Sequence, residues 1–549
     1  MDAARPQDPA RALGRPVSHP TAARRILRSS ALIAVGTACS RASGFVRLAT
    51  IAAVLGFTRL TDAYNLANES PNMVYELLIG GVLTAVLVPT FVTVDEDNDH
   101  RGRAAVFGTT LLALAIITGI AVLLAPVLAA LTTLRVDASL RALERAVVTD
   151  LMRFLLLEIF FYGWFALLAA ALNARRRFVA AAFAPALNNV VVVGLFLGIE
   201  YFVNGSFDLA SRANDDEFLL WLGLGTATGI VVMTLALLPA ARRAGIPLRT
   251  RIAPRDPAVK RLIRLSGWTL GYVVANQVAL WVVLILAARE AGGVSAYLGA
   301  FLFFMFPYGL LAVSITTAIA PELVTATRSD DHAALSRIYS MGARLVVLTM
   351  ALAAAVFVPL GRPIVQAALS RGAFSGSAAS LTASTLVGLS VGLPAFALYL
   401  YSLRLFYARQ NTRTPFWCNL VQNAVAIVLA IAFAARWGVP GIAWAIAFSY
   451  VVAAAVTLVV AHRTVGTLGG RSLVAGIVRP LVAAVGAGAA AFGVRTVVDN
   501  AWAAVALGTA VAVAVFLGVL VALRGDELAL ARSLRRRPSA APSPADVTP

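Results

Sequence analysis

Charged residues are scarce in this chain, and so are cysteine and histidine. Of its 549 residues 13% are charged and 60% are hydrophobic, with two cysteines and four histidines. A soluble protein has roughly 25% charged residues, so the composition excludes a soluble globular protein and indicates a polytopic membrane protein. Cys39 and Cys418 both fall in apolar stretches, which argues against a disulfide framework.

Sequence motifs for nucleotides and metals are also missing. The chain has no CxxC pair, no His/Cys cluster with metal-ligand spacing, no GxGxxG in a strand–helix unit and no P-loop. Nothing in the residues suggests an ATPase or a hydrolase. We therefore expect a protein that is not an enzyme and that holds no cofactor and no metal.

The net charge of +19 is distributed unevenly along the chain. Hydropathy predicts about fourteen spans, and Lys and Arg are roughly threefold more frequent in one set of alternate connections than in the other. The positive-inside rule then predicts a multi-pass protein of the plasma membrane with both termini in the cytoplasm. Because the basic residues follow the topology, we interpret them as topology signals that contact membrane lipids, and we expect no nucleic-acid partner.

Two sequence blocks resemble each other and suggest an internal repeat. LNARRRFVAAAFAPALNN begins at Leu172, and LRLFYARQNTRTPFWCN begins at Leu403, about 230 residues later. Each block closes an apolar span, passes through a short basic loop, and starts the next span with Phe and a nearby Pro. The alternative is that basic cytoplasmic hairpins simply look alike. A true repeat would favour a transport site near the midplane between two lobes.

The predicted fold is all-α, with two pseudo-repeated lobes followed by two C-terminal helices. By residue number we expect a disordered basic cytoplasmic tail over 1–25, an N-terminal lobe with spans one to six over 26–245, a C-terminal lobe with spans seven to twelve over 246–465, spans thirteen and fourteen over 466–525, and a disordered cytoplasmic tail over 526–549.

Arg41 and Arg47 stand inside the first apolar segment, which is long enough to cross a bilayer. A guanidinium stays charged at any ordinary pH and costs about 2.5–3.5 kcal/mol near the bilayer centre, so it faces a partner or a wet cavity. On a straight helix the two lie about 120° apart. We expect Ser43 and Gly44 to bend the helix so that both arginines reach one anion-binding cavity. The alternative for Arg47 is that it snorkels to the outer interface.

The next apolar segment carries acidic and amide side chains around a proline. Asp62 stands at its outer end and is a natural counter-charge for Arg47. Asn72 directly follows the proline, which frees a backbone carbonyl. Glu76 lies one turn further at membrane depth, where we expect it to pair with Arg41 or to couple transport to protons.

Later spans contain further polar side chains. Asn419 and Asn423 are one helical turn apart on one face, so they either coordinate a cation through their carbonyls or act as hydrogen-bonding glue between helices. Glu158 is either a coupling group or a protonated carboxyl without a role.

Several blocks together resemble the MurJ (MviN) lipid II flippases, a family within the multidrug/oligosaccharidyl-lipid/polysaccharide exporter superfamily. SRASGFVR from Ser40, TDAY from Thr61 and the PN pair at Pro71 are similar to the family's N-terminal signature. LNxxxRFxxxAFAPxLxN, FPYG from Phe306 and FYARQxxRTP from Phe406 are similar to later family blocks, in the same order.

The resemblance implies a bundle of fourteen helices in two lobes around a cationic cavity. It implies alternating-access export of lipid II, the undecaprenyl-pyrophosphate-linked peptidoglycan precursor, from the inner to the outer leaflet for cell wall synthesis. It assigns the family's two arginines of span one to Arg41 and Arg47, and its aspartate of span two to Asp62.

Two departures from the family pattern change the charge of the expected cavity. Tyr75 and Glu76 stand where many members have a basic pair, and Leu302 stands where many have an arginine.

The expected partners are lipid II and membrane lipids, and the expected state is a monomer. The expected substrate-binding residues are Arg41, Arg47, Asp62, Asn72 and Glu76, and the possible coupling or cation residues are Asn419, Asn423 and Glu158. The alternative function is a cation-coupled exporter of drugs, or of another polysaccharide-linked lipid, from the same superfamily.

Overall fold

The computed structural model is all-α. It describes residues 20–76, 87–96, 99–246, 249–260, 267–329, 331–466 and 468–523, and these contain helices and no strand. The predicted tail at 526–549 and residues 1–19 of the other tail lie outside the described residues. The first helix begins at Pro20, inside the tail predicted for 1–25.

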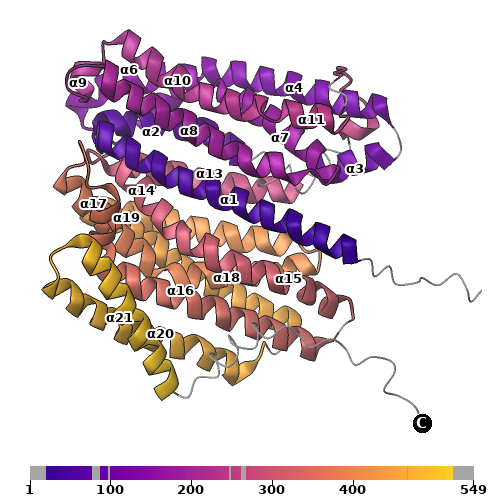
Figure 1. Cartoon of the computed structure of the whole chain (residues 1–549), viewed down its shortest axis with the longest axis vertical. Helices are drawn as coiled ribbons and strands as arrows, with labels where there is room; N and C mark the ends of the chain where they lie inside the picture. Colours follow the sequence, from indigo (N-terminus) through magenta and orange to yellow (C-terminus); the bar gives the residue numbers. More distant parts are fainter. Residues whose placement is uncertain are drawn as a thin grey trace, which may run out of the picture.

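Helices from the first half of the chain group together on one side of the molecule (Figure 1). Their bounds are α1 Pro20–Leu55, α2 Arg59–Glu76, α3 Val88–Glu96, α4 His100–Leu123, α5 Ala125–Thr132, α6 Ala138–Leu155, α7 Glu158–Ala174, α8 Phe178–Phe202, α9 Leu209–Arg212, α10 Asp216–Leu235 and α11 Leu238–Arg243. α1 packs along α8 and runs diagonally between the two groups of helices.

Helices from the second half form the other side, with α20 and α21 packed on α16 at its edge (Figure 1). Their bounds are α13 Gly267–Ala287, α14 Gly293–Pro307, the π-helical turn η3 Tyr308–Ala312, α15 Val313–Arg328, α16 His332–Leu369, α17 Gly376–Val391, α18 Leu393–Ala408, α19 Arg413–Val465, α20 Gly470–Val497 and α21 Ala501–Ala522. The lobe boundary predicted at 245/246 falls just after α11 and remains a prediction, as do the other domain bounds.

Local sequence explains several helix starts. Side-chain oxygens of Asp99, Asp331, Ser375 and Asn500 accept hydrogen bonds from the first turns of α4, α16, α17 and α21. Such caps satisfy N–H groups that have no partner inside the helix. Residues 388–392 read GLSVG, but this GxSxG pattern lies at a break between two helices and lacks the strand of a nucleophile elbow.

α19 is a hairpin of two antiparallel arms rather than one long helix. Gly438 has non-helical angles, with φ of 59° and ψ of −143°. Gln422 Nε2 donates to Ser449 Oγ at 3.0 Å although the two residues are 27 apart in sequence. A straight helix would separate them by about 40 Å, so the chain must fold back on itself. α19 therefore supplies two of the predicted crossings.

The two repeated sequence blocks form turns with the same backbone conformation. Arg176 and Gln410 both have φ of 57°, and they are the only non-glycine residues with positive φ in the described part of the chain. The closing hydrogen bonds are Arg177 N–H to Leu172 O at 2.8 Å and Asn411 N–H to Phe406 O at 2.9 Å. Both are helix-ending turns of the Schellman type, which supports the interpretation of a repeat.

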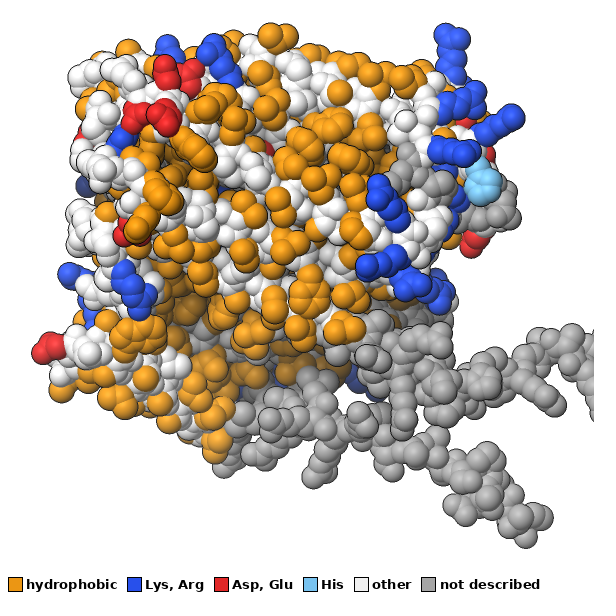
Figure 2. Space-filling view, turned by 45° about the horizontal axis from the view of Figure 1, so that its top comes forward, with side chains coloured by type: hydrophobic (Ala, Val, Ile, Leu, Met, Phe, Trp, Pro, Cys, Tyr) orange, Lys and Arg blue, Asp and Glu red, His pale blue; other side chains and the backbone are white. Residues whose placement is uncertain are grey.

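The surface agrees with a membrane-spanning bundle. Eleven described helices are long and apolar enough to cross a membrane, or twelve if the bent pair α17 and α18 is one span. Figure 2 shows a broad band of hydrophobic side chains with Lys and Arg gathered toward the two ends. The second predicted span runs into residues 77–86, outside the described residues, so the total of fourteen remains a prediction.

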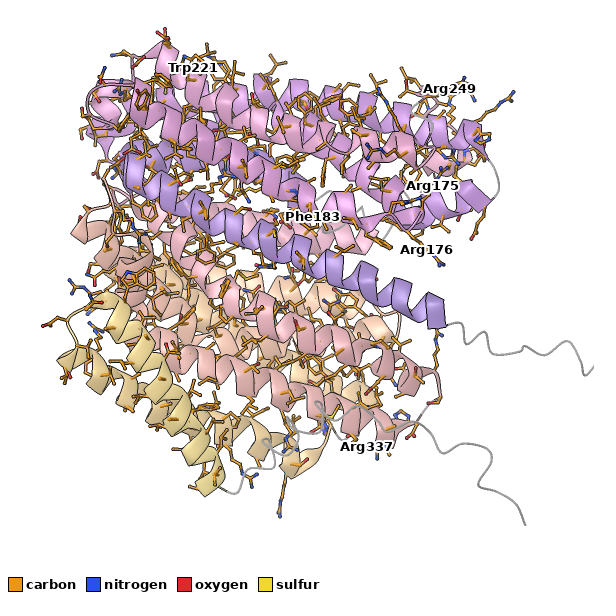
Figure 3. The ribbon with its side chains drawn as sticks, viewed as in Figure 1. Arg175, Arg176, Phe183, Trp221, Arg249 and Arg337 are labelled. Carbon is orange, nitrogen blue, oxygen red and sulfur yellow. The ribbon has the colours of Figure 1, made fainter. Side chains whose placement is uncertain are left out.

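One end of the bundle is rich in arginine, and the opposite end holds the two halves together. Arg175, Arg176, Arg249 and Arg337 all lie toward the same end, away from Trp221, while Phe183 of α8 lies beside α1 (Figure 3). At the other end α2 of the first half contacts α13 and α14 of the second. Below, this second end is called the outer end, following the charge-based topology.

Candidate functional site

α1 is straight where the sequence predicts a bend, and this separates its two arginines. The α-helix continues through Ser43 and Gly44. Asn189 of α8 donates to Ser40 O at 3.2 Å and to Ser43 Oγ at 3.0 Å, which explains the small polar residues as a packing seam. The expected bend is therefore wrong, and a straight helix sends Arg41 and Arg47 in different directions.

Arg47 points into the first half of the bundle, not to the outer interface. Its Nη2 donates to Tyr64 Oη at 3.5 Å, and Tyr64 Oη lies 3.3 Å from Thr226 Oγ1 of α10. Arg47 also interacts electrostatically with Glu158 of α7 and Glu69 of α2. It is half-buried, so its guanidinium retains donors for a further ligand.

Asn72 joins the same cluster through its amide. It accepts a hydrogen bond from Tyr162 Oη at 2.7 Å and donates to Glu69 Oε1 at 3.4 Å. Tyr75 packs on the Tyr162 ring, with centroids 4.3 Å apart. A position where the family resemblance implies a basic residue thus holds an aromatic ring. The name N-lobe cluster is used below for the set Arg47, Tyr64, Glu69, Asn72, Tyr75, Glu158 and Tyr162.

Glu158 is the most deeply buried acid of the N-lobe cluster. It is 1% exposed, and neither carboxylate oxygen has a hydrogen-bond partner. It begins α7 after the break at residues 156–157, near the middle of the 37-residue membrane segment Ala138–Ala174. A broken helix at the bilayer midplane is typical of transporter binding sites.

Arg41 points toward the second half of the bundle. A Cβ at Gly309 of η3 would lie 2.6 Å from Nη1 of Arg41, so the guanidinium lies directly on that glycine. Tyr308, the neighbouring residue, interacts electrostatically with both Arg41 and Arg404 of α18. Both arginines are exposed. π-Helical turns such as η3 occur frequently at functional sites.

Arg404 is a candidate that sequence reasoning missed. Its signal was its place in the repeated block, three residues before Tyr407, within a span that is otherwise apolar. Leu302, where related sequences carry an arginine, is half-buried in α14. The leucine at position 302 suggested that this half lacks a cation. Arg404 supplies one beside Tyr308.

Asp62 does not serve as the counter-charge of Arg47, and that prediction is wrong. Its Oδ1 accepts from the Ser295 N–H at 2.9 Å and from Ser295 Oγ at 2.7 Å, and it is fully buried. Ser295 lies in the first turn of α14, where unpaired N–H groups and the helix dipole attract a carboxylate. Asp62 thus caps a helix of the opposite half, which holds the outer end closed.

Arg59 strengthens this closure. Its Nη1 and Nη2 donate to the carbonyls of Ala288 at 2.5 Å and Arg289 at 2.8 Å, both at the end of α13. Nη1 also lies 3.6 Å from Oε2 of Glu144, a fully buried acid of α6. Asn65 Nδ2 adds a bond to Ser295 Oγ at 3.0 Å. The first two turns of α2 therefore make five hydrogen bonds to the second half, through Arg59, Asp62 and Asn65.

Glu76 is not brought to Arg41. It is the last described residue of α2, it is exposed, and it interacts electrostatically with Glu69 and Tyr75 of its own helix. The reason is geometric, because Arg41 lies against Gly309 of the other half.

The second half of the bundle holds an amide triad in place of a charged cluster. Asn419 Nδ2 and Asn423 Nδ2 donate to the same oxygen, Asn276 Oδ1, at 2.8 and 2.9 Å. Asn423 Nδ2 also lies 3.1 Å from Asn419 Oδ1. Among the described residues no three His, Cys, Asp or Glu side chains are placed to hold a metal ion. The triad satisfies itself and joins α13 to α19.

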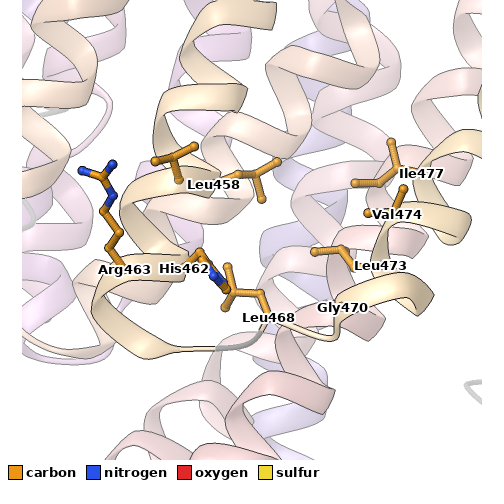
Figure 4. A pocket seen from close by; sticks show the side chains of 9 residues that line it. Leu458, His462, Arg463, Leu468, Gly470, Leu473, Val474 and Ile477 are labelled. Atoms are coloured by element: carbon orange, nitrogen blue, oxygen red, sulfur yellow. The ribbon is translucent and has the colours of Figure 1, made fainter.

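An apolar pocket lies outside this polar centre. It is formed where α19 ends and α20 begins, and its wall is mostly aliphatic with His462 and Arg463 at one side (Figure 4). Its lining residues are Leu458, Val459, His462, Arg463, Leu468, Gly470, Leu473, Val474 and Ile477. None of them belongs to the N-lobe cluster or to the surroundings of Arg41.

Known proteins match the chain over most of its length. The family model "Lipid II flippase MurJ" matches residues 51–513. A probable lipid II flippase MurJ of Rhizobium meliloti is 27% identical over 427 residues, covering 76% of this chain and 77% of that protein. One from Vibrio cholerae is 27% identical over 442 residues, covering 78% and 81%.

Solved structures agree on the fold. A lipid II flippase MurJ in an inward closed conformation superposes with a TM-score of 0.74 at 18% identity, covering 92% of this chain and all of that one. An inward-facing multidrug resistance transporter of the MATE family superposes with a TM-score of 0.63 at 15% identity, covering 78% of this chain and 96% of that one. The match of the family model over most of the chain shows that this protein belongs to the MurJ family of lipid II flippases.

Proposed function

We propose that this protein moves lipid II from the inner to the outer leaflet of the plasma membrane by alternating access. The observation that carries the proposal is the placement of Arg41 and Arg47 on one straight helix between the two halves, inside a bundle of a lipid II flippase family. The activity is transport rather than catalysis. The membrane is the plasma membrane, with the arginine-rich end and both termini in the cytoplasm.

The cargo's diphosphate suits this arrangement chemically. A lipid-linked diphosphate cannot cross the bilayer unaided because its charged group would lose its hydration. Arg41 and Arg404 both act on Tyr308, and Arg47 lies about 9 Å from Arg41 along α1. Guanidinium groups bind phosphate oxygens in bidentate fashion, so each half offers cations for a diphosphate: Arg47 on one side of α1, and Arg41 with Arg404 on the other.

The closed outer end supports the direction of loading. Asp62 and Arg59 join α2 to the first turn of α14 and the end of α13, so cargo must enter from the arginine-rich end. Breaking these few bonds would open the outer end. The membrane potential, negative inside, favours outward movement of an anion by about 2.3 kcal/mol per charge per 100 mV, so no nucleotide site is required.

Complementation of a bacterium depleted of its own flippase tests the proposal. Arg41→Gln and Arg47→Gln should each fail to restore growth at normal membrane expression, and purified protein in liposomes should lose lipid II flipping. Arg337→Gln, an exposed arginine at the cytoplasmic end, is the matched control and should behave as wild type. Full flipping by both Arg41→Gln and Arg47→Gln would overturn the proposal.

The acidic side chains near Arg47 favour a second candidate, a proton-coupled exporter of cationic drugs. Glu69, Glu76 and Glu158 give that region more acids than bases among the described residues. A drug exporter would transport a fluorescent cation such as ethidium in liposomes with an imposed proton gradient. We expect no such transport, because the arginines on α1 would repel the cation.

A further inference from the structure

We propose that Glu158 is the internal counter-ion of Arg47, and that it takes up a proton when the cargo's diphosphate replaces it there. This inference rests on the proposed function and adds one residue and one proton to it. Loading would exchange one anion at Arg47 for another, and the displaced carboxylate would become a neutral carboxyl.

The surroundings of Glu158 leave it without hydrogen-bond donors. It is 1% exposed near the middle of the segment Ala138–Ala174, and both of its oxygens lack a hydrogen-bond partner. Asp62, which is equally buried, differs because Ser295 gives it two hydrogen bonds. A buried carboxylate without donors is stable in its charged form only while a nearby cation compensates it. Arg47 is the cation that acts on Glu158.

Among the described residues, the helices that pack on α7 carry no other cation that acts on Glu158. α3, α4, α8, α10 and α11 pack against it, but their titratable residues occupy only their end turns. Arg47 of α1 and Tyr162 of α7 are the titratable groups that interact electrostatically with Glu158. Tyr162 interacts in turn with Glu69 and Tyr75 of α2, a helix that also packs against α7. The tyrosines are neutral at ordinary pH, and the other acids add negative charge.

Arg47 is free to change partners. It is half-buried, and its hydrogen bond to Tyr64 is long at 3.5 Å. When a diphosphate binds its guanidinium, Glu158 faces added negative charge and shares its only cation. Like charges in one site favour protonation of the weaker acid, so Glu158 accepts a proton from the water on the open side. On release the proton leaves and the pair forms again.

The coupling between cargo binding and protonation of Glu158 determines how the affinity for lipid II changes with pH. Cargo and proton bind together, so a lower pH on the loading side tightens binding, by up to about tenfold per pH unit across the titration of Glu158. The proton travels outward with the cargo, so each cycle carries one negative charge fewer than the cargo itself. Acid on the outer side should slow release.

Binding of purified lipid II to the full chain in nanodiscs tests the inference. Lipid II has a diphosphate diester that does not titrate near neutral pH, so proton uptake reports on the protein. Titration calorimetry in buffers of different ionisation enthalpy counts the protons. We expect uptake that rises from a small fraction of a proton per lipid II at pH 7 toward one proton at pH 9 for wild type, and none for Glu158→Gln.

The variant also separates a counter-ion from a merely structural residue. Removal of a competing anion should make Glu158→Gln bind lipid II about tenfold more tightly than wild type at pH 8.5, and equally well at low pH. Damage to the fold would weaken binding at every pH. Glu200→Gln, which neutralises an exposed glutamate at the end of α8, is the matched control and should keep the wild-type pH slope.

Should Glu158→Gln fail to fold, the wild type still gives an answer. Dicyclohexylcarbodiimide modifies protonated buried carboxyls, so lipid II should increase its labelling of Glu158 at pH 9, measured by mass spectrometry. Binding of lipid II without proton uptake, or with uptake unchanged in Glu158→Gln, would overturn the inference while leaving the proposed function intact. Absence of lipid II binding at every pH would overturn the proposed function itself.

Discussion

Each half of the bundle has one pair of helices whose contact is held by asparagine hydrogen bonds, here called a seam. The two seams differ in the residues around them. α1 packs along α8 through Asn189, and α13 packs along α19 through Asn419 and Asn423. Each seam follows one of the two turns with matching backbone. In the first half a charged cluster adjoins the seam, whereas in the second an amide triad forms the seam itself.

This difference shows which properties the repeat preserved and which it did not. The asparagines keep helices together in both halves, a role that needs only a donor and an acceptor. The charges have accumulated in one half, where Arg47 faces Glu158 and Glu69. Binding and coupling are therefore expected in the first half and at the interface, while the second half supplies Arg404 and the surface that α2 closes against.

The largest expected effect concerns the charged pair. At pH 9 Arg47→Gln should destabilise the protein by up to about 3 kcal/mol, because the buried carboxyl must then either stay charged without its cation or take up a proton from alkaline solution. The double variant Arg47→Gln/Glu158→Gln should recover most of that loss. Thermal unfolding in detergent measures both. If the two single losses simply add in the double variant, the pairing of these residues is wrong.

The second largest effect is expected for the equilibrium between the closed and the open outer end when Asp62 is replaced. Asp62→Asn weakens the cap on α14, which costs about 1–2 kcal/mol and shifts the balance toward an open outer end by roughly five- to thirtyfold. Labelling of a cysteine introduced at Ala63 with a membrane-impermeant thiol reagent measures this opening. Asp216→Asn, an exposed acid at the same end, should leave the labelling rate unchanged. Equal labelling in both variants would remove Asp62 from the closure.

Removing the amide triad should lower the stability of the protein and should not change how transport depends on the cation in the buffer. Asn276→Ala removes the oxygen that two amides share, and a loss of about 1 kcal/mol is expected. Asn189→Ala in the other seam should cost a similar amount. Transport by either variant should be the same in sodium and in potassium buffers. A sodium requirement in wild type that Asn276→Ala abolishes would instead support the cation-coordinating role considered for Asn419 and Asn423.

A single methyl group at Gly309 should disturb Arg41 with little loss of stability. The new Cβ would lie 2.6 Å from Nη1 of Arg41, and the flexible side chain can move aside. We expect Gly309→Ala to weaken lipid II binding by a few-fold, about 0.5–1 kcal/mol. Gly194→Ala on α8, where a Cβ meets nothing within 4 Å, is the control. Unchanged binding in Gly309→Ala would argue that Arg41 does not contact cargo from this position.

Substitutions in the loop around Asp208 should have the smallest effect on transport. Asp208 caps α9, and hydrogen bonds from Ser206 and Ser211 lower its pKa to about 2. A lowered pKa means that the capping contribution is present above about pH 4, the ordinary pKa of Asp, and is lost as the pH falls toward 2. Asp208→Asn should leave flipping unchanged at pH 7. It should only speed amide hydrogen exchange in residues 209–212.

Much of the architecture followed from one-dimensional patterns. Long apolar runs predict helices across a membrane, and the matching blocks at Leu172 and Leu403 predict turns that indeed share one backbone conformation. Hydropathy also predicted two spans in the region of α19, and the structure places the break between its two arms at Gly438. These features depend on neighbours in sequence, so local chemistry suffices to predict them.

The partners of the polar residues were harder to predict. Asp62 was expected beside Arg47 and instead caps α14, because free N–H groups of a helix end in the other half lie closer. A bend at Ser43 and Gly44 was expected, yet Asn189 uses those residues as a seam for a straight helix. Arg404 escaped notice because nothing in its own segment reveals the tyrosine across from it.

The sequence by itself determined that this protein is an all-α membrane bundle, that its first span carries two permanent charges, and that its blocks match the lipid II flippases. Only the tertiary structure decided which half each arginine faces and which acid each one meets. The physical reason is that helical periodicity fixes the angle between two side chains on one helix. The helix that lies at each angle is chosen by packing between segments far apart in the chain.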